Sequence, residues 1–181
     1  MSPKRATKIG TSRSVGTRKE SRSPSIRHSE ETVLSFIFSV FSIRAHLDDI
    51  HQIWAKLLGV SEPQWLILLA IDELDSGEGV PGTKIAAKLH IHPVFVTTQT
   101  KSLEKAGFVT RKTSAVDARF VLMSLTSKAR AEFAKLSAQR RALNESLFVG
   151  LDDQAFQVVT DKLTEIMKNA ERAARRLSAE D

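Results

Sequence analysis

An aspartate and an arginine separated by one residue, Asp117 and Arg119, form the most distinctive chemical pair in this sequence. A carboxylate can hold a guanidinium through two parallel hydrogen bonds, and residues two apart share one side of an extended chain. We therefore predict that Asp117 fixes the position of the Arg119 guanidinium. A long cation held in this way suits a narrow, strongly electronegative groove.

A second group of residues has the pattern of one exposed helix face, between Pro93 and Ala106. A helix can read duplex DNA from the major groove because each base pair presents a distinct set of donors, acceptors and methyl groups there. Valine and threonine methyls suit thymine methyls, and threonine hydroxyls suit phosphates or base edges. The residues of this helix that we predict to contact DNA are Val94, Thr97, Thr98 and Lys101.

The sequence around these residues predicts a helix-turn-helix. Residues 83–90 form a short helix with one apolar face, and the segment from His90 to Pro93 is the turn. The second helix starts at Pro93, and Gly107 ends it in the left-handed conformation. We expect its inward side chains to be Val96, Gln99 and Leu103.

A β-hairpin is predicted directly after the second helix. Residues 108–112 and 120–125 are β-rich runs, and the tip between them is Val116-Asp117-Ala118-Arg119. This hairpin would be the wing of a winged helix-turn-helix, with Arg119 entering the minor groove. Arg111 and Lys112 at its base would flank the DNA phosphates.

Further helices are predicted on both sides of the helix-turn-helix and hairpin. Apolar residues recur at helical spacing over residues 31–58, the helix over residues 63–74 is apolar nearly all round at its centre and should be buried, and two more helices are predicted over residues 126–148 and 152–177. Ser61-Glu62-Pro63-Gln64 is a capping-box pattern, and Thr126 and Asp152 are N-cap residues. The apolar stripes extend beyond what a small winged domain can cover, which favours a dimer.

The predicted fold class is therefore mainly α, with a winged helix-turn-helix domain and an α-helical dimerisation lobe formed by the N- and C-terminal helices. The predicted domains are a disordered basic tail (1–28), an N-terminal dimerisation helix (29–60), the winged helix-turn-helix domain (61–126) and C-terminal dimerisation helices (127–178).

The basic charge of the chain is concentrated at its beginning. The formal net charge is +6, but residues 1–28 contain eight lysines and arginines and one acid, Glu20. The remainder is close to neutral, so charge alone is a poor argument that the folded part binds DNA. With no cysteine, disulfides and thiol chemistry are excluded. We expect a cytoplasmic protein, since neither a secretory signal nor a membrane span is apparent.

The segment resembles the MarR family of transcriptional regulators. The residues that carry this resemblance are Ser61 to Trp65, Leu103 to Val109, Asp117-Ala118-Arg119 and Leu125-Thr126. It covers residues 31–177 and implies a homodimer that binds a pseudo-palindromic operator in double-stranded DNA and releases it on binding a ligand. Thr98 stands where family members often have arginine. Pro81-Gly82 replaces the usual serine or threonine cap, so we expect that helix to start a residue or two later.

The resemblance also implies an effector site between the two lobes, lined by the first, second and fifth helices. Its candidate residues are Arg44, His46, His51, Trp54 and Trp65. A cation beside flat apolar walls would suit an aromatic carboxylate or its coenzyme A thioester. The alternative is that both tryptophans belong to the core and Arg44 forms a surface ion pair.

The remaining function classes are less well supported. His46 and His51 point apart on a helix, and His90 and His92 flank a turn without nearby acids, so we predict no metal site and no cofactor. We expect His92 to be a helix cap. No paired carboxylates, phosphate loop or nucleophile motif indicates an enzyme. The alternative function is a winged-helix protein-interaction module that does not read DNA.

Overall fold

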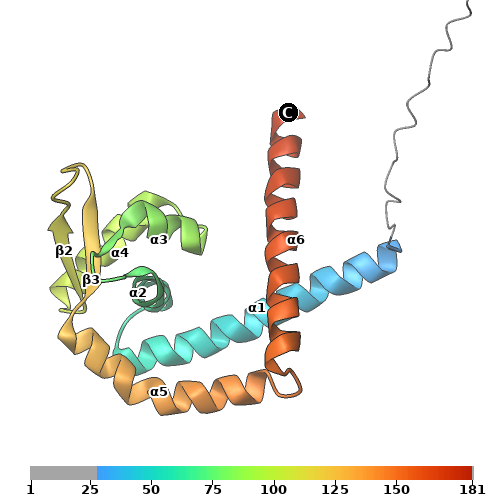
Figure 1. Cartoon of the computed structure of the whole chain (residues 1–181), viewed down its shortest axis with the longest axis horizontal. Coiled ribbons are helices and arrows are strands. Elements are labelled where there is room, and N and C mark those ends of the chain that lie inside the picture. Colours follow the sequence, from blue (N-terminus) through green and yellow to red (C-terminus); the bar gives the residue numbers. More distant parts are fainter. Residues whose placement is uncertain (1–27, 181) are drawn as a thin grey trace, which may run out of the picture. The chain divides into compact units, whose positions relative to one another are not determined.

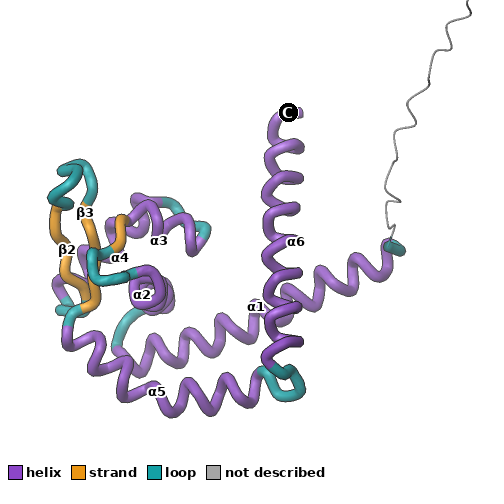
Figure 2. Tube along the Cα trace, viewed as in Figure 1, coloured by secondary structure: helices purple, strands orange, loops and turns teal. Residues whose placement is uncertain are grey.

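The computed structural model describes residues 28–180, so nearly all of the predicted tail lies outside the described residues. The chain divides into two units, Met1–Ala45 and His46–Asp181. The predicted order of six helices around a hairpin is confirmed, and a short strand adds to it (Figures 1 and 2). The elements are α1 (Glu30–Leu58), α2 (Glu62–Leu74), β1 (Val80–Pro81), α3 (Gly82–Leu89), α4 (Pro93–Lys105), β2 (Val109–Thr113), β3 (Val121–Leu125), α5 (Ser127–Leu147) and α6 (Asp153–Glu180).

Helix α2 is the centre of the core, as its run of apolar residues predicts. The backbone N–H of Ser61 donates to the Gln64 side chain at 3.1 Å, which is the side-chain half of the predicted capping box. Side chains from α3, α4, the sheet and α5 pack around α2. The fully buried large side chains are Trp65, Ile67, Leu68, Ile71, Val80, Ile85, Val96, Thr100, Leu103 and Val109.

The helix-turn-helix has the predicted turn, with two corrections. Helix α3 starts at Gly82, earlier than we expected, with Pro81 at its N-cap. In α4, Thr100 is buried where Gln99 was predicted, and Gln99 is only half-buried, although both positions fit the helical period equally well. The Thr100 hydroxyl donates to the Thr97 carbonyl at 3.2 Å, which satisfies the buried polar group.

The sheet has three antiparallel strands in the order β1-β3-β2. In the hairpin, Val109 pairs with Leu125 and Thr113 with Val121. On the other side of β3, Val80 pairs with Met123 and Pro81 with Leu122. We did not predict β1, since two residues cannot show a strand period.

Caps define the starts of the last two helices as predicted. Thr126 Oγ1 accepts from Ala129 N at 3.1 Å, and Asp152 Oδ1 accepts from Ala155 N at 2.8 Å. Thr126 Oγ1 also donates to the Gly107 carbonyl at 2.7 Å, which joins the start of α5 to the end of α4. Apolar side chains of α6 are 42–49% exposed, namely Phe156, Val159, Leu163, Ile166 and Met167.

The described part of the first unit, residues 28–45, holds the first half of α1. Its apolar side chains are exposed: Val33, Leu34, Phe36, Ile37, Phe38, Val40, Phe41 and Ile43. Phe38 and Phe41 make an edge contact with ring centroids 6.5 Å apart. Despite this composition, none of the helices that the structure describes is long and apolar enough to cross a membrane.

Candidate nucleic-acid interface

The tip of the hairpin holds the predicted ion pair. Arg119 Nε donates to Asp117 Oδ1 at 3.0 Å and to Oδ2 at 3.1 Å, and Arg119 Nη2 lies 2.7 Å from Oδ2. The reason differs from our prediction, because this segment is a turn and not an extended strand. Phe120 N donates to Asp117 O at 3.0 Å, and Arg119 N donates to Asp117 Oδ1 at 3.0 Å. The carboxylate therefore holds both the backbone and the guanidinium of Arg119.

The Arg119 guanidinium stays at the surface of the hairpin. The arginine side chain is 86% exposed, although one edge of the guanidinium is bound to Asp117. Its side-chain hydrogen bonds lower the pKa of Asp117 and raise the pKa of Arg119. Both groups thus stay ionised at neutral pH. Val116 beside them is 97% exposed, so the tip presents a large apolar side chain together with the cation.

Helix α4 presents a narrow stripe away from its buried side. Opposite Val96, Thr100 and Leu103, the helical period places Val94, Thr98, Lys101 and Lys105, and all four are exposed. Thr97 lies on the flank and is half-buried. Three predicted contact residues therefore share the outward stripe. Sequence reasoning missed Lys105, although its spacing from Lys101 would have identified it.

The stripe begins at a capped helix start. His92 Nδ1 accepts from Val94 N at 3.2 Å, so His92 is the cap that we predicted. The Thr97 hydroxyl donates to Pro93 O and the Thr98 hydroxyl to Val94 O, each at 3.1 Å. Both hydroxyl protons are thus used inside the helix.

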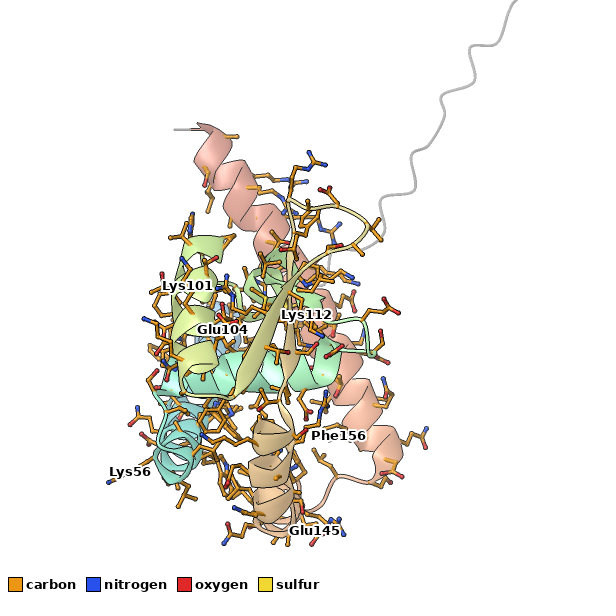
Figure 3. The ribbon with its side chains drawn as sticks, turned by 90° about the vertical axis from the view of Figure 1, so that its left-hand side faces the viewer. Lys56, Lys101, Glu104, Lys112, Glu145 and Phe156 are labelled. Atoms are coloured by element: carbon orange, nitrogen blue, oxygen red, sulfur yellow. The ribbon has the colours of Figure 1, made fainter. Side chains whose placement is uncertain are left out.

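Arg111 is tied to α4, whereas Lys112 is exposed. Arg111 Nη1 lies 3.5 Å from Glu104 Oε2, and the arginine side chain is only 15% exposed. Its buried Nε has no hydrogen-bond partner. Figure 3 shows Lys101 and Glu104 along α4 and Lys112 on the neighbouring strand. Arg111 therefore links the wing to the second helix of the helix-turn-helix.

A cavity of about 190 Å³ lies where α3, α4 and the wing meet. It is lined by Thr83, Thr97, Arg111, Arg119 and several apolar residues. Two arginines therefore line one cavity beside the start of α4, and each is paired with a carboxylate, Arg111 with Glu104 and Arg119 with Asp117.

A second cavity, of about 110 Å³, contains part of the predicted effector site. His51, Trp54 and Trp65 line it, together with Arg140 and Asn144 of α5. Arg44 and His46 are exposed. The Arg140 guanidinium lies 5.6 Å from the ring centroids of both Trp65 and Phe133. Sequence reasoning did not select Arg140 among the several basic residues of α5.

The hairpin beside α4, with its held arginine, defines a winged helix-turn-helix. Residues 60–121, which hold the helix-turn-helix and most of the hairpin, match the model of the MarR family. No curated protein sequence matches the chain.

Many solved structures share the fold. A MarR protein from Peptoclostridium difficile is 22% identical, with 86% of this chain and 97% of that chain covered and a TM-score of 0.64. CouR from Rhodococcus jostii bound to p-coumaroyl-CoA is 21% identical, with coverages of 76% and 95% and a TM-score of 0.65. A putative MarR family regulator from Listeria monocytogenes complexed with 26mer DNA is 20% identical, with coverages of 74% and 87% and a TM-score of 0.63. At these identities the likeness establishes the fold.

Proposed function

We propose that this protein is a homodimeric, sequence-specific regulator of transcription that binds double-stranded DNA and acts as a repressor. The observation that supports this most directly is Arg119, which Asp117 holds in place while 86% of its side chain stays exposed. An arginine at a wing tip is placed to enter a narrow minor groove. The exposed stripe of α4 would enter the adjacent major groove.

The exposed apolar side chains of α6 and of the first half of α1 support dimerisation, because a second copy of the chain would cover them. A two-fold dimer presents two recognition helices, so its operator would be a pseudo-palindrome. In the proposed repression, the operator overlaps a promoter and the bound protein excludes the polymerase from it. The structures of the Listeria monocytogenes regulator and of Streptococcus pneumoniae FabT, each in complex with DNA, support the DNA-binding part of this proposal by analogy.

DNA binding is tested with the full chain and duplexes from the upstream region of its own gene. We expect one duplex to bind more tightly than random duplex of equal length. Arg119→Ala should weaken this binding by about 1–3 kcal/mol. A matched control is Arg175→Ala, since Arg175 is also exposed and also near an acid, Glu171. Equal binding to all duplexes would contradict the proposal and favour a protein-interaction module.

We further propose that the cavity beside Arg140 is an effector site. Arg140 can supply the charge for a carboxylate, and Trp54 and Trp65 can supply the flat walls. The cavity of about 110 Å³ is smaller than the roughly 150 Å³ that holds benzene, so an aromatic acid would have to widen it or extend out of it. A coenzyme A thioester, as in the Rhodococcus jostii structure, would need most of its length outside this cavity.

A ligand that pairs with Arg140 would draw the guanidinium away from the rings of Trp65 and Phe133. Because Trp65 belongs to α2 and Arg140 to α5, this would change the packing of the winged domain against the helix that follows it. The test is a thermal-shift assay with benzoate, 4-coumarate and 4-coumaroyl-CoA. We expect stabilisation that Arg140→Ala abolishes and Arg172→Ala preserves. No shift with any of the three would contradict these ligand classes.

A further inference from the structure

The first two turns of the outward stripe of α4 lack the side chains that usually distinguish bases by paired hydrogen bonds. Asparagine and glutamine recognise adenine in this way, and arginine or lysine recognises guanine. The stripe contains Val94, Thr98, Lys101 and Lys105, so the first side chain of these types is Lys101, in the third turn of the helix. Gln99 is half-buried and lies toward the core side of the helix. Base recognition by the first turns of α4 must therefore use other chemistry.

The threonine hydroxyls cannot donate to bases in this conformation. Each hydroxyl carries one proton, and those of Thr97 and Thr98 are donated to main-chain carbonyls of the preceding turn. Turning either hydroxyl toward a base would break that bond. What both residues keep available is a methyl group and an acceptor oxygen.

Apolar surface dominates the start of the same helix. In its capped first turn, the Val94 side chain is 66% exposed and Phe95 on the flank is 40% exposed. The exposed apolar groups would pack against methyl groups, and the partial positive charge of the helix N-terminus would attract the phosphates on either side of them. In the major groove these methyl groups belong to a run of thymines, since thymine alone among the four bases presents a methyl group there.

We propose that the first turns of α4 recognise thymine 5-methyl groups, with Val94 as the principal contact and Thr98 and Phe95 beside it. This inference rests on the proposed DNA binding. Lys101, one turn further on, would supply attraction to a phosphate or a base acceptor. Each operator half-site should accordingly contain at least one thymine whose 5-methyl group itself contributes to the affinity for the protein.

The test starts with selection of binding sites from a random duplex library by the full-length protein. Each thymine of the selected half-site is then replaced by deoxyuridine in both half-sites, which removes only the methyl group. We expect at least one thymine position to be sensitive. Each methyl group lost from a contact there should weaken binding by about threefold to fivefold, which is the effect of exposing one buried methyl group. The minor-groove contacts of the wing should be unaffected, because the methyl lies in the major groove.

Protein variants identify the partner of the methyl group. For the Val94→Ala variant, replacing thymine by deoxyuridine should cost little or no affinity, because the side chain that contacts the thymine methyl group has been removed. Val149→Ala is the matched control, since Val149 is 82% exposed in the segment between α5 and α6, and it should keep the full penalty.

The possible results separate the inference from the proposed function. Selected sites that bind equally well with thymine and deoxyuridine would overturn the inference and leave DNA binding intact. An unchanged penalty in Val94→Ala would overturn the role of Val94. If no sequence is enriched at all, the proposed function fails and the inference fails with it.

Discussion

At the scale of single residues, the hairpin tip depends on one carboxylate that does two tasks. Asp117 accepts from the backbone of Arg119 and from its guanidinium. A charged side chain of this length would otherwise sample many rotamers, and ordering it on DNA would cost side-chain entropy. Asp117 reduces that cost before DNA arrives, so we regard it as a positioning residue.

Asp117→Asn therefore tests whether Asp117 matters more for positioning Arg119 or for its own negative charge near the DNA phosphates. The substitution removes a negative charge beside a polyanion, which by electrostatics alone should tighten DNA binding. If Asp117 positions Arg119, affinity should instead fall, by about 1 kcal/mol, because the paired charged hydrogen bonds are lost. Fluorescence anisotropy with a labelled operator at fixed salt measures the sign, and tighter binding by the variant would contradict this role.

His51 gives a prediction for pH dependence. Partial burial lowers the pKa of His51 below its ordinary value of 6.5, although Asp48 and Glu62 oppose this. As the pH falls through 6.5, the unfolded chain takes up the proton before the folded protein does. This histidine therefore contributes stability above that pH, and the contribution is lost as the pH falls toward the lowered pKa.

Thermal unfolding should show this effect by comparison with His51→Gln, which cannot titrate. Between about pH 7.5 and about pH 5.5, the wild type should lose more stability than the variant. The difference between the two proteins removes the contribution of all other groups. Parallel losses in both proteins would show that His51 does not contribute.

At the scale of elements, Thr126 connects three parts of the domain. Its hydroxyl caps α5 by accepting from Ala129 N, and it donates to the Gly107 carbonyl where α4 ends and the wing begins. The side chain therefore joins the recognition helix, the end of strand β3 and the start of α5. A single small side chain thus fixes how the wing leaves the helix-turn-helix.

Thr126→Ala should destabilise the protein by about 1–2 kcal/mol, since it removes a helix cap together with a second hydrogen bond. Thr126→Ser keeps the hydroxyl and is the control, with a much smaller expected loss. Denaturation by urea, followed by circular dichroism, measures both. Equal losses in the two variants would mean that the methyl group and its packing matter more than the hydroxyl.

The elements also show where sequence reasoning works. Helices with a strong apolar period and a capping residue, such as those begun by Ser61, Thr126 and Asp152, were predicted to within a few residues. Strand β1 was missed because it forms only through pairing with β3, a contact that no local pattern records. Arg140 was missed for a related reason, since its partners Trp65 and Phe133 become its neighbours through tertiary packing.

The wing pair was predicted correctly for a reason that proved wrong. Alternation along an extended chain would place Asp117 and Arg119 on one side, yet the observed contact depends on a turn closed by the aspartate side chain. Residue types that pair strongly can find each other in more than one local geometry. The partners were therefore predictable, and the backbone between them was not.

At the scale of the whole molecule, the exposed apolar stripe of α6 favours self-association. Phe156, labelled in Figure 3, begins this stripe, and Leu163 and Ile166 continue it. Leu163→Glu should convert the proposed dimer to monomer, because a charge would be buried without a partner. Lys168→Glu, on the opposite side of α6, introduces the same residue and should leave the dimer intact. Light scattering after size-exclusion chromatography distinguishes these results, and a dimeric Leu163→Glu would contradict this interface.

The strand pairing of Pro81 limits how copies of this chain can meet. Strand β1 lies at one border of the sheet, and its proline has no backbone N–H to offer to another chain. A second molecule cannot readily extend the sheet on that side, so edge-to-edge stacking of the kind that leads to fibrils is discouraged there. The protein can therefore carry large apolar helix faces for specific pairing, while this border of the sheet resists the commonest route to aggregation.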